Sequence, residues 1–487
     1  MIVMKFGGSS LESAGAIQQA AYLVKQNLQL FPVVVVSAMG NTTDRLLEAA
    51  EGAATGSSYS TTRHVEAIRR LHYQETRALL GPRAEPFLGD NITPLFLELQ
   101  EELVEITEGR RLTPEIQDRV LSYGERMSSL TMAEALRREG INASQVDARK
   151  LIVTNEQFGQ ALPFYWETYA RLRRTVALVA KDRVVVMGGF IAATYKGATT
   201  TLGRGGSDLT ASLVGAGISA DEIQIWTDVD GMLTCDPRVL SGCPPIPEIS
   251  YEEAQEMARC GAKVLCPTSI APALRQRIPI VIRNSRRPEA AGTRVVSSPT
   301  GPAGAVKSLA CKTGLALVHM RVKNSAALSS ITDGLADLFA TAMVDVELIQ
   351  AREQGIVFAV RNWPGLGSTL RQVDENVEIA VEEDRAAIWL VGQEVAHSEA
   401  NLTRALEALR NEDLRMTAQG SSSVSLGFVV PEDQLRSAVK HLHNEFFPAP
   451  DSHRLGMAGL QATKTGEFVE PPAMPAAYRQ PRALPAR

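Results

Sequence analysis

The sequence lacks the features that mark several classes of protein. It has no apolar stretch near the roughly 20 residues of a membrane-spanning helix, so no membrane segment is expected. Lysine and arginine (50) nearly balance aspartate and glutamate (55), and no long basic run occurs, so nucleic acid is not an expected partner. The five cysteines show neither disulfide-framework nor zinc-ligand spacing. With Met1 leading straight into an apolar run, these absences favour a reduced, cytoplasmic protein without a metal cage.

The 487 residues are too many for one hydrophobic core, so several domains are expected. Up to about residue 292, apolar β-branched runs alternate with helical patterns, which predicts an α/β fold with a mainly parallel sheet sandwiched by helices. A helical insert is expected at about 60–137. The predicted strands include Ile2–Phe6, Val33–Ser37, Val184–Val186, Ile223–Trp226 and, as the last one, Ile280–Arg283.

The composition of the sequence and the order of its predicted elements change after residue 292. Residues 293–310 are rich in glycine, proline and serine and predict a linker. Two segments, 311–380 and 381–447, then each follow a strand, helix, strand, strand order, which predicts two small α+β domains. The proline-rich segment 448–487 predicts a disordered tail.

The segment Thr199–Thr210 combines three glycines, an arginine, an aspartate and several hydroxyls. Glycines allow close backbone approach, and free N–H groups leading into a helix bind anions. Arg204 can hold a carboxylate or a phosphate through paired hydrogen bonds. A flexible, capped glycine turn is the simpler interpretation, but the whole composition favours a ligand site.

Lys5 stands in a predicted strand that stops at Gly7 and Gly8 and leads into a helix. The lysine precedes the glycines, unlike the order in a Walker loop. It is either an edge-strand lysine that discourages aggregation or a charge at the mouth of a phosphate-binding turn. The glycines and serines that follow favour the second interpretation.

Seven strings, in this order, resemble aspartate kinase of the amino-acid kinase superfamily. They are residues 5–10 (KFGGSS), 36–44 (VSAMGNTTD), 121–129 (LSYGERMSS), 200–208 (TTLGRGGSD), 226–231 (WTDVDG), 234–238 (TCDPR) and 261–265 (GAKVL). The two small domains then resemble ACT domains, with residues 418–422 (AQGSS) matching the second one's signature. The resemblance implies an amino-acid-kinase-like fold and transfer of phosphate from ATP, with Mg²⁺, to the side chain of L-aspartate. This is the first step of lysine, threonine and methionine biosynthesis.

The resemblance also implies roles for individual residues. The catalytic positions are Lys5, Asp208 and Lys263. Asp208 could hold a lysine or the substrate amine, or act through magnesium. The implied ATP-binding positions are Lys5, Gly7, Gly8, Ser9, Thr227, Asp228, Leu233, Arg238 and Lys263. The implied aspartate-binding positions are Thr43, Glu125, Arg204 and Ser207, with Arg204 on the α-carboxylate and Glu125 on the α-ammonium.

The chemistry agrees with this set of residues, because a carboxylate is already an ionised nucleophile at neutral pH and needs no general base. Three departures from the family pattern stand out. Leu233 replaces a frequent aromatic residue and Cys266 a frequent histidine. The first ACT-like loop, residues 323–328, lacks glycine, although Glu347 could offer an anion to an effector. Lysine or threonine is the expected effector, weakened feedback is predicted, and a homodimer or tetramer is expected.

Two other interpretations stay open at this point. One is a different small-molecule kinase of the same superfamily, which would share the glycine-rich phosphate site but not the 123–127 string or the paired ACT units. The other is a catalytically silent amino-acid sensor. Retention of Lys5, Arg204 and Asp208 argues against a silent protein.

Overall fold

A largely parallel sheet organises the first 296 residues. In the computed structural model, β1 (Ile2–Phe6) pairs in parallel with β2 (Pro32–Val36) on one side and with β8 (Glu222–Thr227) on the other. The strand order is β3-β5-β2-β1-β8-β10-β11-β9. The remaining strands are β3 (Ala143–Gln145), β5 (Val184–Gly188), β9 (Glu248–Ser250), β10 (Ile280–Asn284) and β11 (Thr293–Val296). The predicted mainly parallel sheet is therefore confirmed.

The structure describes residues 1–180, 182–262, 266–322, 339, 345–352, 355–363, 365–370, 377–419 and 423–448. Met1–Phe446 form one compact unit. The predicted tail after Pro448 lies outside the described residues, as do the glycine-free loop at 323–328 and residues 420–422 of the second ACT signature. In the described part of the chain, no helix is both long enough and apolar enough to cross a membrane.

The prediction that Ile280–Arg283 is the last strand of the sheet is wrong. β11 follows β10 and pairs with it antiparallel. β11 occupies the first four residues of the predicted linker, and the next sheet already begins at Ser308. Because β11 is only four residues long and stands among glycines and prolines, its alternation of buried Thr293 and Val295 with more exposed neighbours is too short to identify from sequence.

Both faces of the sheet are buried, and β1 shows how. Ile2, Met4 and Phe6 point into the hydrophobic cluster on one face, whereas Val3 belongs to the cluster on the other. Because side chains alternate along a strand, Lys5 shares the face of Val3. That face is covered by α9 (Gly206–Ile218), which packs against β1 and β8.

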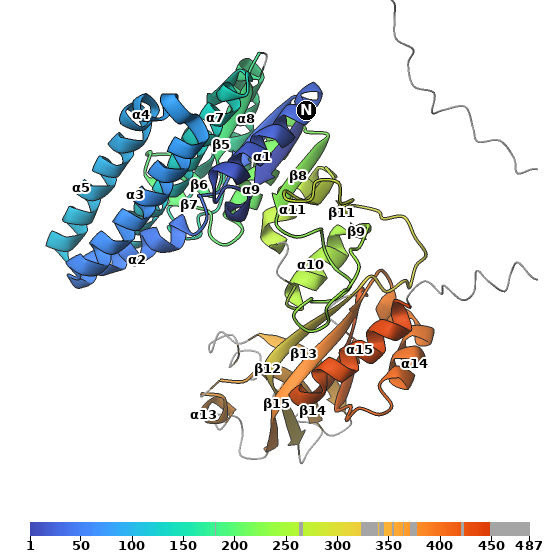
Figure 1. Cartoon of the computed structure of the whole chain (residues 1–487). Coiled ribbons are helices and arrows are strands. Elements are labelled where there is room, and N and C mark those ends of the chain that lie inside the picture. Colours follow the sequence, from blue (N-terminus) through green and yellow to red (C-terminus); the bar gives the residue numbers. More distant parts are fainter. Residues whose placement is uncertain are drawn as a thin grey trace, which may run out of the picture. The chain divides into compact units, whose positions relative to one another are not determined.

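Helices cover both faces (Figure 1). On the face of Ile2, α1 (Ala14–Gln26) and α7 (Tyr123–Arg138) contact each other, and α2, α3 and α5 extend this layer. The predicted helical insert corresponds to α3 (Ser58–Leu80), α4 (Ala84–Phe87), α5 (Thr93–Gly109), α6 (Pro114–Leu121) and α7. The other helices of this region are α2 (Thr42–Thr55), α8 (Tyr165–Val179), α10 (Tyr251–Arg259) and α11 (Pro267–Arg275).

A small second sheet has the order β4-β6-β7 and consists of β4 (Val153–Thr154), β6 (Ile191–Thr194) and β7 (Thr199–Thr201).

A separate antiparallel sheet follows, which we name the regulatory sheet (residues 308–431). Its order is β13-β14-β12-β15-β17-β16. Its two central strands, β12 (Ser308–Val322) and β15 (Val377–Val391), pair along their whole length. The other strands are β13 (Val346–Arg352), β14 (Gly355–Arg361), β16 (Met416–Gln419) and β17 (Ser425–Pro431), and the helices are α13 (Leu366–Leu370), α14 (Glu399–Ala408) and α15 (Leu435–Phe446). The boundary predicted at 380/381 therefore falls inside β15.

Candidate active site

Four parallel strands bring the predicted site residues to one edge of the sheet. In the order β5-β2-β1-β8, their carboxyl ends lead into Gly189, Ser37, Gly7 and Asp228. In open α/β sheets, ligands bind at the edge formed by the carboxyl ends of the strands, where the loops take no part in the hydrogen bonds between strands. The site is therefore assembled from segments up to 221 positions apart in sequence, from Gly7 to Asp228.

Lys5 lies at the centre of this edge. Its Nζ is 2.7 Å from Oδ1 of Asp208, in the first turn of α9. Lys5 is only 9% exposed, and β1 is an inner strand. The edge-strand interpretation of Lys5 is therefore wrong, because the residue is buried in an inner strand. Of the alternatives for Asp208, the structure shows the lysine contact.

The glycine turn after β1 offers fewer donors than expected. The N–H of Gly7 donates to the carbonyl of Trp226 at 3.1 Å, so it is not free for a ligand. Gly8–Ser10 form a single 3₁₀ turn. Among the described residues, the N–H groups of Gly8 and Ser9 make no hydrogen bond, which leaves these two as candidate anion donors.

Glu125 is a buried carboxylate with one unused oxygen. It lies in the first turn of α7 and is 3% exposed. Its Oε1 accepts from the N–H of Ala38 at 3.1 Å, whereas Oε2 has no hydrogen-bond partner among the described residues. Burial raises the pKa of Glu125 to about 8, although the N–H of Ala38 acts in the opposite direction. Such a carboxylate lacks a counter-charge, which an ammonium group would supply.

The other predicted substrate positions lie in two turns at this edge. Thr43 is half-buried in the first turn of α2, and Ser207 is half-buried in the first turn of α9. The backbone of Gly189 lies against Ser207, since a Cβ on Gly189 would come within 2.7 Å of the Ser207 Cβ. Arg204 is exposed, and its guanidinium forms no ion pair within the described ranges. It remains available for an anionic ligand.

A cavity of about 300 Å³ lies beyond the end of β8. It brings together four predicted nucleotide residues, namely Thr227, Asp228, Leu233 and Arg238. Arg238 is exposed and holds Asp236 through its Nε at 3.0 Å. Lys263 lies outside the described residues, but Gly261 and Ala262 line the same cavity. Cys266 is the residue before α11, with Sγ 3.2 Å from the Thr268 hydroxyl.

One wall of this cavity comes from a segment that was not predicted to belong to the site. Residues Ser308–Cys311 of β12 line it, although 308–310 were predicted as the end of a linker and Cys311 as the start of the first ACT-like domain. The N–H of Leu309 donates to the carbonyl of Thr234 at 2.7 Å and so joins the regulatory sheet to the cavity loop. The sequence carries no local signal for this contact, because the two residues are 75 positions apart.

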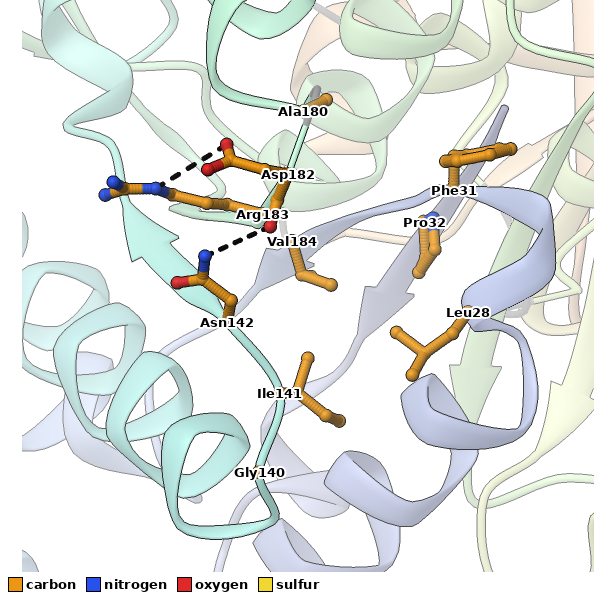
Figure 2. Close-up of a pocket in the computed structure, with 10 residues that line it drawn as sticks. All are labelled: Leu28, Phe31, Pro32, Gly140, Ile141, Asn142, Ala180, Asp182, Arg183 and Val184. Carbon is orange, nitrogen blue, oxygen red and sulfur yellow. Dashed lines mark hydrogen bonds and ion pairs between the residues drawn. The ribbon is translucent and has the colours of Figure 1, made fainter.

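A second cavity lies away from this edge (Figure 2) and is also about 300 Å³. Its walls are the segments just before β2, β3 and β5, around Pro32, Asn142 and Val184. Asn142 donates to the carbonyl of Asp182 at 3.1 Å across one side. Because these segments enter the amino ends of the strands, this cavity is not part of the Lys5 site.

The chain is similar in sequence and in structure to known proteins. Residues 1–284 match the model of the amino acid kinase family, and residues 388–446 match an ACT domain. The chain is 32% identical to lysine-sensitive aspartokinase 3 of Escherichia coli, over 92% of this chain and 99% of that one. It is 31% identical to chloroplastic aspartokinase 1 of Arabidopsis thaliana, over 93% of this chain and 81% of that one. The crystal structure of E. coli aspartokinase III with aspartate and ADP superposes with a TM-score of 0.76 at 30% identity, covering 92% of this chain and 100% of that one.

Proposed function

Because the chain belongs to the amino acid kinase family and is an aspartokinase, we propose that the site around Lys5 transfers the γ-phosphoryl group of ATP to the side-chain carboxylate of L-aspartate. The single observation that carries the assignment of residues is the Lys5–Asp208 ion pair, at 2.7 Å. This ion pair lies between the buried carboxylate of Glu125 on one side and the cavity beyond β8 on the other.

Aspartate is proposed to bind on the β2 and β5 side. Glu125 supplies the counter-charge for the α-ammonium through its unused Oε2. Arg204 binds the α-carboxylate, since its guanidinium offers two parallel donors. Thr43 and Ser207 offer hydroxyl groups to the same substrate. This arrangement leaves the side-chain carboxylate of aspartate to face the centre of the edge, where Lys5 lies.

The nucleotide is proposed to occupy the cavity beyond β8, lined by Thr227, Asp228, Leu233 and Arg238. Its phosphates would extend toward the free N–H groups of Gly8 and Ser9. Lys263 is proposed as a second lysine at the phosphates, on the family resemblance alone. Leu233 offers an apolar but non-aromatic contact to the base.

In the proposed reaction an oxygen of the aspartate side chain attacks the γ-phosphorus, and the bond from that phosphorus to the bridging oxygen of ADP breaks. The attacking group is already ionised, so no proton needs to move. Catalysis then rests on positioning and on neutralising charge on the transferred group. Lys5 supplies that positive charge, and Asp208 fixes the position of its ammonium group.

Magnesium is proposed to enter with ATP. Within the described ranges there is no group of three or more His, Cys, Asp or Glu residues that could hold a metal ion. Asp208 is already paired with Lys5, so phosphate oxygens would be the main ligands, as is common for this ion. Its chemistry would be to neutralise phosphate charge.

We further propose that the enzyme is a homodimer or tetramer and takes part in lysine and threonine biosynthesis. The exposed apolar side chains of edge strand β13, Val346 and Ile349, support assembly through the regulatory sheet. Lysine or threonine is the proposed effector. Light scattering of the full chain, with and without these amino acids, tests the assembly.

A substrate panel tests the function itself. ADP release would be measured with ATP and L-aspartate, L-glutamate, N-acetylglutamate or carbamate, and the acyl phosphate would be trapped with hydroxylamine. We expect turnover and a hydroxamate with L-aspartate. Turnover with another acceptor but not with aspartate would contradict the assignment, and ADP release with none would favour a silent sensor.

A further inference from the structure

Asp118 is a fully buried carboxylate outside the residues discussed so far. It lies in α6, is 0% exposed and forms no ion pair with any described residue. Its Oδ2 accepts from the N–H groups of Thr201 and Gly159, at 2.8 and 2.9 Å. Its Oδ1 accepts from the Thr201 hydroxyl at 2.6 Å. Burial raises the pKa of Asp118, and these three hydrogen bonds act in the opposite direction.

Two of the three donors are main-chain N–H groups far away in sequence. A buried carboxylate is costly unless its oxygens are fully hydrogen-bonded, so these bonds fix the two backbone segments relative to α6. An apolar residue could fill the same space at lower cost. The use of a carboxylate therefore indicates that the position of these segments matters.

One of these segments leads to Arg204. Thr201 ends β7, an edge strand of the small sheet, and Arg204 follows three residues later. The second segment packs against the same turn, because a Cβ on Gly203 would lie 3.2 Å from the carbonyl oxygen of Gly159. Gly203 has a φ of +71°, so its backbone requires glycine as well. Asp118 thus holds both sides of the base of the Arg204 turn.

The main chain of Asp118 leads to Glu125. The carbonyl of Asp118 accepts from the N–H of Ser122, and the carbonyl of Ser122 accepts from the N–H of Arg126, both at 3.1 Å. Arg126 is the neighbour of Glu125 in the first turn of α7. α6 and α7 are therefore connected by successive hydrogen bonds, and Asp118 stands two turns before Glu125.

We propose that Asp118 is a positioning residue for substrate recognition: it sets the distance between the turn that carries Arg204 and the helix that carries Glu125. The inference rests on the proposed function, in which these two side chains bind the opposite charges of one amino acid. Because the carboxylate and the ammonium of an α-amino acid have a fixed separation, recognition needs a fixed separation of their partners.

Kinetics of three variants test this proposal. Asp118→Ala removes the acceptor of the buried Thr201 N–H and of the half-buried Gly159 N–H. We expect the KM for aspartate to rise about ten- to a hundredfold, with little change in the KM for ATP. In Asp118→Asn, the amide oxygen can accept from both N–H groups while the amide nitrogen donates to the Thr201 hydroxyl. This conservative variant should stay within a few-fold of the wild type. Thr201→Val removes only the hydroxyl bond and should cause a smaller change in the same direction.

The matched control is Thr168→Val. The hydroxyl of the fully buried Thr168 accepts a hydrogen bond from the N–H of Val153 at 3.1 Å, and this variant removes it. It should lower the melting temperature without raising the KM for aspartate. A second measurement needs no activity: trypsin should cleave after exposed Arg204 faster in Asp118→Ala than in the wild type or in Thr168→Val.

Equal increases in both KM values, or an unchanged KM for aspartate with unchanged cleavage after Arg204, would overturn the proposal. If Asp118→Ala does not fold, Thr201→Val and the cleavage rates decide. A wild type that does not phosphorylate aspartate would overturn the proposed function instead, and the cleavage experiment would still test whether Asp118 holds the turn.

Discussion

Replacing Glu125 by glutamine should separate binding of aspartate from binding of ATP. The side chain keeps its shape and its hydrogen bond from Ala38, but it loses the charge that we propose faces the α-ammonium of aspartate. Leaving one member of a buried charge pair without its partner costs about 2–5 kcal/mol. We therefore expect kcat/KM for aspartate to fall about 30-fold to several thousandfold. The KM for ATP should change little.

The pH dependence provides a sharper test, because the pKa of Glu125 is raised to about 8. At pH 7 only about a tenth of the free enzyme would have this carboxylate ionised. Since kcat/KM reports on the free enzyme, its value for aspartate should rise with pH, reach half of its plateau near pH 8 and level off above it. This rise should be absent in Glu125→Gln.

The same group makes stability depend on pH. Its folded-state pKa of about 8 lies above the ordinary value of 4.5, so the folded chain binds more protons between these two values. The free energy of unfolding should therefore fall as pH rises across this window, by roughly 5 kcal/mol at most from this group. Glu125→Gln lacks this loss and should gain stability relative to the wild type between pH 5 and 8.

The assays are initial rates from pH 6 to 9 and urea unfolding without aspartate. Glu134→Gln is the matched control, because Glu134 lies on the same helix but pairs with Arg137 at the surface, at 2.9 Å. A flat wild-type profile, or a rise that persists in Glu125→Gln, would refute the reasoning. Equal changes in both KM values would assign Glu125 a structural role.

Three further outcomes are expected. Lys5→Met should lower kcat by at least about a hundredfold, because it removes the charge that we propose faces the phosphoryl group. Adding Asp208→Asn to this variant should restore stability but not turnover. Near-normal turnover of Lys5→Met alone would remove Lys5 from the mechanism. Gly189→Ala should raise the KM for aspartate, since its Cβ would come within 2.7 Å of Ser207, whereas Gly15→Ala, with nothing within 4 Å, should behave as wild type. Lysine and threonine, titrated singly and together at sub-saturating aspartate, should inhibit weakly, and strong submillimolar inhibition by either would contradict the weakened-feedback hypothesis.

The fold of the first 296 residues was largely predictable, because its inner strands are runs of β-branched residues that end in glycine or polar turns. Val33–Val36 and Ile223–Trp226 are both fully buried, and such runs stand out in a sequence. β11 and β9 did not stand out, since three or four residues give too few alternations to define a period.

The candidate site was predictable where it consists of local strings and not where it depends on distant contacts. Lys5 and Asp208 each belong to a glycine-rich string, but their ion pair joins residues 203 positions apart and appears only in three dimensions. Asp118 gave no signal, because a single aspartate in a helix is normally a solvated residue. The engaged N–H of Gly7 and the cavity wall from β12 were likewise set by neighbours that are remote in sequence.

The regulatory sheet has a consequence for how this part of the gene can be changed. β14 pairs with the later part of β12, and β17 pairs with the later part of β15, while the two long strands pair with each other throughout. The two halves of the sheet are β13-β14-β12 and β15-β17-β16. Because β12 and β15 pair with each other, each half needs a long strand of the other half for its hydrogen bonds. A fragment cut at residue 380 would divide β15 and leave both halves incomplete. Exchange of regulatory modules between homologous genes, in nature or in the laboratory, should therefore succeed only when both halves move together.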